Sequence, residues 1–172
     1  MLKFLAGVVL GIALLLAAAF LFVTRGGMPM AVSGKPLPLE QFIAHAALAN
    51  AIGKEADRAS PLSADERNLA AGVRIYRANC AVCHGLPEQP LSPIARGLFP
   101  PPPRLFPGKG VSDDPVGETY WKVRNGIRHT GMPGFADSLS EPELWQVSLL
   151  LAKSDQLSPP VRQQLGVAAA AR

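Results

Sequence analysis

The 172-residue chain has only two cysteines, few aromatic residues (6%) and few charged residues (17%). Two cysteines are too few for a disulfide-stapled scaffold or for a zinc site with four cysteine ligands. Charged residues average about 25% in soluble proteins, so the shortfall suggests that part of the chain lies in lipid. The net charge is +4, with 13 acidic residues among 17 basic ones. This balance gives no case for nucleic-acid binding.

Patterns of alternating polar and apolar residues, the mark of half-buried strands, are also missing over any useful length. The 17 prolines and 16 glycines indicate a loop-rich fold. Where apolar residues recur, they do so at helical spacing. The sequence therefore predicts an all-α protein with long irregular connections.

Residues 4–23 have no charged or strongly polar side chain. A helix of this length spans about 30 Å, the thickness of a bilayer's hydrocarbon core. We predict a membrane anchor over residues 1–24. The alternative is a signal peptide cleaved near Ala17-Ala18-Ala19, but the apolar run exceeds the usual signal core and cleavage would leave an apolar terminus. Lys3 on one side against Arg25 and Lys35 on the other leaves the orientation open.

The rest of the chain divides by composition and by capping signals. We predict a linker over residues 25–62, rich in glycine and proline at its start, with a short helix at about 39–52. Ser63 and Glu66 form a capping-box pattern at the start of a helix that runs to about Asn79. Dense prolines between residues 86 and 107 argue against regular structure there.

Two further helices follow in the sequence. One begins after Asp113-Asp114-Pro115 and ends at Asn125-Gly126. The other begins at a second capping-box pattern, Ser140 with Glu143, and runs to about Lys153. Residues 156–172 are predicted to be a flexible, alanine-rich tail. Residues 63–155 therefore make up the predicted folded domain.

Both cysteines lie in one pentapeptide, Cys80-Ala81-Val82-Cys83-His84, which is the attachment pattern of c-type haem. Two thiols three positions apart can form thioethers with the two vinyl groups of one porphyrin, and the next residue can ligate the iron. A thioredoxin-like redox site needs a βαβ context, which is missing. A metal site needs more thiol or imidazole ligands, for which only His45 and His129 remain. We predict one covalent haem c.

Met132 is the candidate for the second axial ligand of the iron. It stands between Gly131 and Pro133, in a stretch that cannot be helical, and such a loop can cross the haem face opposite His84. Thioether sulfur favours Fe(II), and His/Met ligation raises the reduction potential. Two alternatives stay open: Met132 as a core filler, and His129 as the ligand of a bis-histidine haem.

These residues carry a family resemblance. A glycine and a tyrosine (Gly72, Tyr76) ahead of Cys80–His84, the proline-rich loop, Gly131-Met132-Pro133 and the closing helix resemble a class I c-type cytochrome. The stretches Tyr120–Ile127, Thr130–Pro133 and Glu143–Trp145 resemble, more narrowly, bacterial mono-haem cytochromes c with an N-terminal membrane anchor. The resemblance covers about residues 63–155.

The resemblance implies three to four helices around the haem, behind one transmembrane helix. It further implies that the first helix crosses the last where Gly72 and Tyr76 meet Leu144 and Ser148. The chain departs from the family pattern at Leu149, where many relatives carry an aromatic residue. That departure concerns the detail of the helix crossing rather than the fold.

Three more features concern the surroundings of the haem. Trp121 and Arg128 are candidate hydrogen-bond donors to the haem propionates, since half-buried carboxylates need charge-assisted partners; a solvated Arg128 is the alternative. Pro101 to Pro103 are expected to wall the His84 side, where a proline carbonyl can orient the imidazole. His45 is expected to be a surface residue.

A covalently held haem with both axial positions filled has no site for a substrate, so the expected function is one-electron transfer rather than catalysis. We predict a single-pass protein of the bacterial inner membrane, held by residues 4–23, with its haem domain in the periplasm, where c-type haem is attached. Its partners would be a redox donor and acceptor, with no small-molecule substrate. The alternatives are a fixed cytochrome subunit of a larger oxidase or dehydrogenase, and catalysis or gas sensing at a five-coordinate iron.

Overall fold

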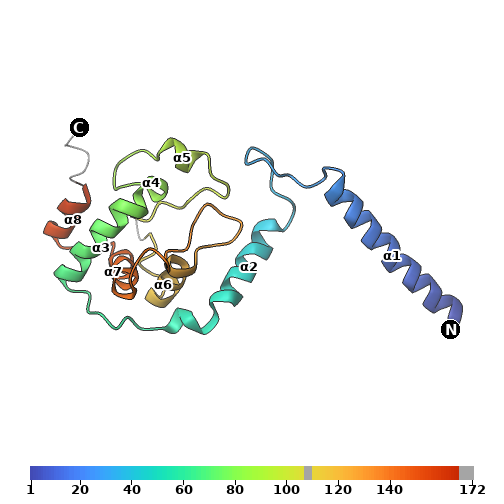
Figure 1. The fold of residues 1–172 in the computed structure, drawn as a ribbon, viewed down its shortest axis with the longest axis horizontal. Helices are drawn as coiled ribbons and strands as arrows, with labels where there is room; N and C mark the ends of the chain where they lie inside the picture. Colours follow the sequence, from blue (N-terminus) through green and yellow to red (C-terminus); the bar gives the residue numbers. More distant parts are fainter. Residues whose placement is uncertain (107–109, 167–172) are drawn as a thin grey trace. The chain divides into compact units, whose positions relative to one another are not determined.

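The computed structural model describes residues 1–106 and 110–166, and within these residues it contains helices and turns but no strand. Pro107 and the end of the predicted tail, residues 167–172, lie outside them. The all-α prediction is confirmed for the described part of the chain. The chain divides into two compact units, Met1–Ala44 and His45–Arg172, which are described separately (Figure 1).

The first unit contains a single long helix, α1 (Leu2–Thr24), whose residues are all exposed. Its most apolar 18-residue window has a mean hydropathy of 2.8, so α1 is long and apolar enough to cross a membrane. After a stretch of turns, α2 (Glu40–Ile52) begins in this unit and continues into the second. The Glu40 carboxylate accepts a hydrogen bond from the Leu37 backbone N–H and so ties down the start of α2.

The second unit is built on three helices, α3 (Glu66–Asn79), α6 (Val116–Asn125) and α7 (Glu141–Ala152), of which α7 packs against both α3 and α6. Its largest fully buried side chains are aromatic: Trp145, Tyr76 and Tyr120. The ring of Tyr120 stacks on that of Trp145, with centroids 3.9 Å apart, and so joins α6 to α7. Helix α7 therefore links α3 to α6 (Figure 1), and Cys80 follows directly after α3.

Capping explains where two of these helices begin. Glu143 accepts hydrogen bonds from both the backbone N–H and the hydroxyl of Ser140, as predicted for α7. At α3 the prediction was displaced by two residues. Asp65, not Ser63, is the N-cap, because its carboxylate accepts from the Asn68 N–H, and Ser63 donates its hydroxyl to that same carboxylate.

Helices α3 and α7 cross at Gly72, as the family resemblance implied. The atoms of α7 nearest to Gly72 belong to Gln146 and Leu150, where we had expected Leu144 and Ser148. A Cβ atom at Gly72 would lie 2.9 Å from Leu150 Cβ and closer still to the Gln146 carbonyl oxygen. Glycine is therefore required by the close approach of the two backbones.

Replacing Gly72 with alanine is expected to lower the free energy of unfolding by about 2 kcal/mol, because a methyl group forced between packed helices costs about 1–3 kcal/mol. Urea unfolding of the holoprotein, followed by circular dichroism, measures this loss. Gly166→Ala is the matched control, since a Cβ at Gly166 meets no atom within 4 Å. Equal stabilities of the two variants would show that the helices do not approach this closely.

The segment before α3 is not the linker that we predicted through residue 62. Ile52 at the end of α2 is only 5% exposed, and the 3-10 helix η1 (Gly53–Asp57) packs on α6. The contact centres on Gly117, where a Cβ atom would lie 2.6 Å from the carbonyl oxygens of Ala56 and Arg58. Residues 45–62 therefore belong to the folded unit, and the predicted flexible connection is shorter.

Two further predictions were wrong. Part of the expected flexible tail forms α8 (Pro159–Gly166), which packs on α3 through the fully buried Val161 and Leu165. The proline-dense segment also contains a helical turn, α5 (Pro93–Arg96), because Ser92 caps it and proline is tolerated in a first turn.

Candidate functional site

The Cys80–His84 segment continues the direction of α3 as one extra helical turn, α4 (Ala81–His84). The Cys80 carbonyl accepts hydrogen bonds from the backbone N–H groups of Cys83 (3.1 Å) and His84 (2.9 Å). Cys80 packs against the core, and this burial, reinforced by the neighbouring Cys83, raises the pKa of its thiol to about 12. The turn thus brings two free thiols and an imidazole together.

The His84 imidazole is fixed by Pro103. Its Nδ1 lies 2.8 Å from the Pro103 carbonyl oxygen, and because a carbonyl can only accept, Nδ1 carries the proton and donates. Burial lowers the pKa of His84, with the Pro103 hydrogen bond opposing part of that shift. The ring is therefore neutral at neutral pH, and its Nε2 lone pair is available to a metal. The expectation that a proline carbonyl orients this ring is confirmed.

Tyr76 holds the turn that follows His84. Its buried hydroxyl donates to the Gly85 carbonyl oxygen at 2.6 Å, and Gly85 has a positive φ of 76°, which favours glycine. The Tyr76 ring also meets Phe106 edge-on, with centroids 4.8 Å apart. One side chain of α3 thus supports both the turn after the imidazole and the end of the proline-rich segment.

Arginine side chains organise the proline-rich segment, whose prolines cannot donate backbone hydrogen bonds. Arg104 donates to the carbonyl oxygens of Gln89 (2.6 Å) and Leu86 (3.2 Å), and Arg96 donates to that of Leu91 (2.6 Å). These bonds hold the mostly irregular segment around α5 in the conformation in which Pro103 reaches His84.

Met132 lies on the loop after α6, partly buried against the same core cluster as Cys80. Its backbone is fixed at both ends of the residue. The Met132 N–H donates to the Thr130 hydroxyl, and the Met132 carbonyl accepts from the Ile127 N–H. The loop lies so close to the end of α6 that a Cβ at Gly126 would lie 2.5 Å from Gly134 N.

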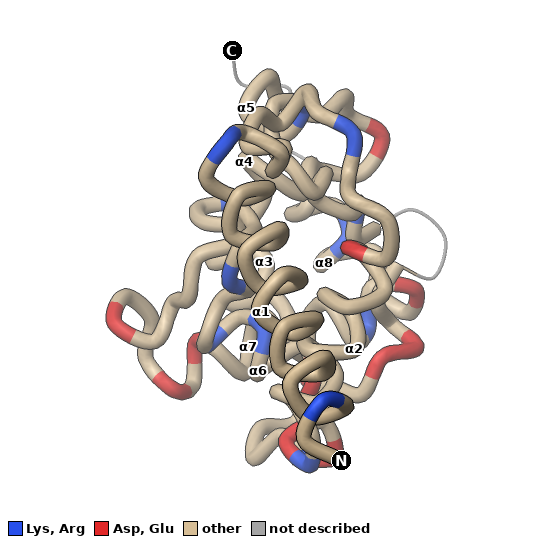
Figure 2. Tube along the Cα trace, turned by 90° about the vertical axis from the view of Figure 1, so that its right-hand side faces the viewer, with Lys and Arg blue, Asp and Glu red and all other residues tan. Residues whose placement is uncertain are grey.

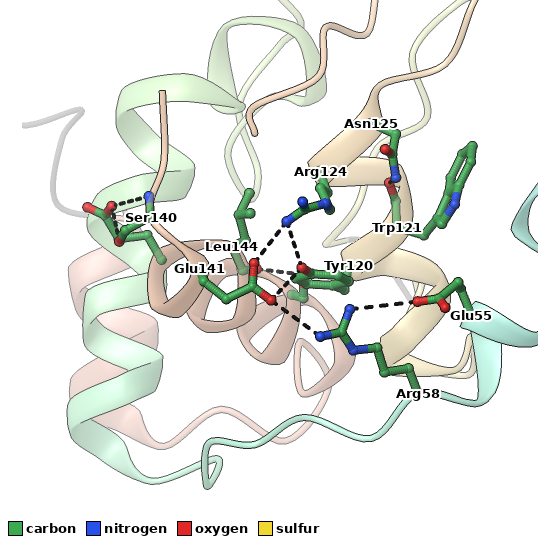
Figure 3. Close-up of polar contacts among 11 residues, drawn as sticks. Glu55, Arg58, Tyr120, Trp121, Arg124, Asn125, Ser140, Glu141 and Leu144 are labelled. Carbon is green, nitrogen blue, oxygen red and sulfur yellow. Dashed lines mark hydrogen bonds and ion pairs between the residues drawn. The ribbon is translucent and has the colours of Figure 1, made fainter. Parts of the chain in front are cut away.

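The other predicted site residues are more exposed. His129 is exposed at a positive φ of 63°, and Arg128 beside it is exposed too. Trp121 on α6 is half-buried, and its ring points away from the polar cluster around Glu141 (Figure 3). The structure thus separates Met132, which packs on the core, from His129, which faces solvent.

Charge is unevenly distributed along the haem-domain sequence. Residues 67–106 contain five arginines and one acidic residue, Glu88, whereas residues 113–143 contain six acidic and three basic residues. Figure 2 shows basic positions around α4 and α5, the region of Cys80–His84. The sequence that contains the two thiols therefore carries a net positive charge.

A polar cluster that no sequence pattern predicted joins the segment after η1 to α6 and α7 (Figure 3). Glu141 accepts from the buried Tyr120 hydroxyl (2.6 Å), from Arg124 (2.9 Å) and from Arg58 (3.4 Å). The Arg58 guanidinium also lies 4.9 Å from the centre of the Tyr120 ring. No local pattern marks this cluster, because Arg58 and Glu141 are 83 residues apart.

Glu141→Gln is expected to lower the free energy of unfolding by about 0.5–1 kcal/mol, the range of ion pairs that solvent screens. The Tyr120 hydrogen bond, aided by Arg124 and Arg58, holds the pKa of the Glu141 carboxyl below its usual range. A depressed folded-state pKa stabilises the fold above the unfolded pKa of about 4.3, and this contribution disappears as the pH falls through the folded pKa. Unfolding at pH 7 and in acid measures the effect.

The exposed Glu88 supplies the control for this prediction. Glu88→Gln should change stability little at either pH. A Glu141→Gln variant that is destabilised equally at neutral and acid pH would show that the carboxylate charge is not what stabilises the cluster.

Comparisons with known proteins bear on the same segment. Residues 67–149 match the family model described as cytochrome C oxidase, cbb3-type, subunit III. No curated protein and no solved structure gives a significant match to the chain. The match begins within α3 and ends within α7, and it includes the Cys80–His84 turn and the Met132 loop. Together with the all-helical fold of the described residues and the haem-attachment pattern, the match supports a class I c-type cytochrome domain with covalently bound haem c.

Proposed function

We propose that this protein is a membrane-tethered, periplasmic one-electron carrier. In this proposal Cys80 and Cys83 form the thioethers, and His84 Nε2 and Met132 sulfur are the axial ligands of the iron. The observation that carries the proposal is the hydrogen bond from His84 Nδ1 to the Pro103 carbonyl, which leaves a neutral imidazole with a free Nε2. Such a bond to the far nitrogen is usual for a metal-bound histidine.

The bound haem supplies the chemistry, a reversible one-electron change at iron. The chain's own residues attach the group, fix its ligands and exclude competitors for the iron. Pro103 orients His84 and Tyr76 holds the turn after it, and hydrogen bonds to Thr130 and Ile127 fix the backbone of Met132, which would supply the second ligand. Filling both axial positions leaves electron transfer as the available reaction.

Met132 is favoured over His129 as the second ligand because it packs on the core while His129 is exposed. A thioether ligand also suits a carrier that works at high potential. Trp121, half-buried on α6, and Arg128 are proposed as propionate donors. An exposed Arg128 can reach a propionate only at the domain surface, where such a contact contributes little to stability.

Helix α1 is proposed to be an uncleaved anchor in the inner membrane, with the haem domain on the periplasmic side. The length and hydropathy of α1 support its role as a membrane anchor. The periplasmic location of the haem domain is supported by the oxidising compartment in which haem is attached to cysteine pairs. A tether raises the effective concentration of redox partners in the same membrane. The net positive charge of residues 67–106, which contain the attachment turn, favours partners with acidic docking surfaces.

A second candidate is a permanent subunit of a larger oxidase, in which this chain passes electrons to a catalytic subunit. The description of the matching family, a subunit of a cbb3-type oxidase, favours it. Purification in mild detergent separates the two proposals. A carrier should elute alone, whereas a subunit should retain a catalytic protein in fixed proportion.

Carbon monoxide tests the carrier proposal against chemistry at an open iron. The reduced wild-type protein is expected to show no spectral change on short exposure, because Met132 occupies the sixth position. Met132→Ala supplies the positive control, since its open site should bind carbon monoxide at once. Rapid binding to the wild-type protein would contradict the carrier proposal and favour catalysis or sensing.

A further inference from the structure

Large exposed apolar side chains are concentrated next to the anchor. Beyond α1, the exposed large hydrophobic residues among those the structure describes are six in residues 25–44 and two in the whole second unit. The six are Met28, Met30, Val32, Leu39, Phe42 and Ile43, and the two are Val82 and Ile94. A folded domain of this kind does not need apolar side chains in its connecting segment, so these residues require another explanation.

Three of the six form a single patch at the start of α2. Leu39, Phe42 and Ile43 are 70%, 71% and 60% exposed. Phe42 and Ile43 are neighbours in the first turn of α2, and Leu39 directly precedes the helix with a positive φ of 65°. The Ile43 N–H donates to the Leu39 carbonyl, which fixes Leu39 to that first turn. We call Leu39, Phe42 and Ile43 the α2 patch.

The opposite side of α2 is already used by the second unit. Leu48 and Ile52, which face away from the α2 patch by helical geometry, line a small cavity of about 330 Å³ beside Glu118 and Lys122 of α6. Ile52 is buried there. Packing against the haem domain therefore explains the apolar residues in the second half of α2, but not those of the α2 patch.

Whatever covers the α2 patch must lie close to the membrane end of the anchor, because Leu39 is only 15 residues beyond Thr24. A flexible chain of that length has an end-to-end distance of about 20 Å and cannot exceed about 50 Å. The intervening segment adds two basic residues, Arg25 and Lys35, and no acidic one. Apolar side chains next to basic residues suit the headgroup region of an anionic bilayer.

We propose that the α2 patch inserts into the membrane interface on the side of the haem domain. Phe42 and Ile43, with Leu39, would lie at the boundary between headgroups and acyl chains, and Arg25 and Lys35 would face lipid phosphates. Interfacial insertion limits the free tether to residues 25–38, so the carrier samples redox partners within the same membrane. The inference rests on the proposed anchor and adds a second, reversible membrane contact to it.

Spin-label depth measurements test the proposal on the full-length holoprotein. Phe42→Cys, Gln41→Cys and Leu14→Cys each add one free thiol, since Cys80 and Cys83 are taken up by the haem. Gln41 is the matched control, exposed on the opposite side of the same turn. Leu14 lies within α1 and reports the anchor. The labelled proteins are reconstituted into vesicles of phosphatidylcholine and phosphatidylglycerol.

The label at position 42 is expected to be several-fold more accessible to oxygen, relative to a water-soluble nickel complex, than the label at position 41. The label at position 14 should lie deeper still. Equal accessibility at positions 41 and 42, with a deep label at position 14, overturns the α2 patch insertion but leaves the anchor standing, and it favours a protein partner. A water-accessible label at position 14 overturns both.

Discussion

Met132→Ala is expected to leave haem covalently attached but to lower its midpoint potential by on the order of 100 mV, within the range of about 0.8 V that axial ligands set. The thioether stabilises Fe(II) over Fe(III), so its loss favours the oxidised state. Because Met132 lies on a loop held by backbone bonds to Thr130 and Ile127, the loop itself should persist in the variant. Potentiometric titration followed by optical spectroscopy measures the shift.

Met28→Ala is the matched control for this prediction. Met28 is a partly exposed methionine in the connecting segment, and its removal should change neither the potential nor the spectrum. An unchanged potential in Met132→Ala would mean that another group binds the iron. His129→Ala would then be the next variant, because His129 stands three residues away on the same loop.

His84→Ala and Cys83→Ala are expected to abolish normal haem incorporation. Each removes one of the three groups that the single turn of α4 brings together. A small domain buries too little surface to hold a large cofactor by packing alone, so covalent attachment and iron ligation are both needed. Haem staining of denaturing gels, with immunodetection of the chain, measures the loss.

His45→Ala separates this effect from general damage to the protein. His45 is an exposed histidine of α2, and the variant should stain as strongly as the wild type. Normal haem content in Cys83→Ala, with an unaltered spectrum, would show that the second thioether is dispensable. Normal content and spectrum in His84→Ala would remove the proximal ligand from the proposal.

The sequence predicted those parts of the fold that depend on local signals. The apolar run of α1, the Ser140 capping box and the glycine after α6 each depend on residues within one or two turns. The missed parts depend on packing between distant segments. Residues 53–62 are polar and resemble a turn, yet η1 docks on Gly117, a contact that no local pattern reveals.

Helix α8 shows a different limit. Val161 and Leu165 are spaced four apart, a helical pattern, but polar residues and the alanine-rich end around them suggested a frayed tail. Val161 and Leu165 are buried because α8 packs on α3, and Arg77 of α3 donates to the Gln164 carbonyl of α8 (2.9 Å). The spacing of Val161 and Leu165 could have predicted the helix, whereas no sequence pattern shows that α3 offers a surface for it to pack on.

The residues of the candidate haem site were easier to predict than the hydrogen bonds that hold them in place. The Cys80–His84 pattern and a proline carbonyl for His84 could both be predicted, because attachment chemistry fixes the spacing and a metal-bound histidine needs an acceptor at Nδ1. The Tyr76 hydrogen bond to Gly85 and the arginine hydrogen bonds to loop carbonyls could not be predicted. These contacts depend on how an irregular proline-rich loop folds back, and hydrophobic periodicity carries no information on that.

The optical spectrum of the purified, oxidised full-length protein is the most direct test of His84/Met132 ligation. A low-spin spectrum with a sulfur-to-iron charge-transfer band, lost in Met132→Ala but kept in Met28→Ala, is the result expected here. A high-spin spectrum, or a low-spin one without that band, would contradict Met132 ligation and with it the proposed one-electron carrier.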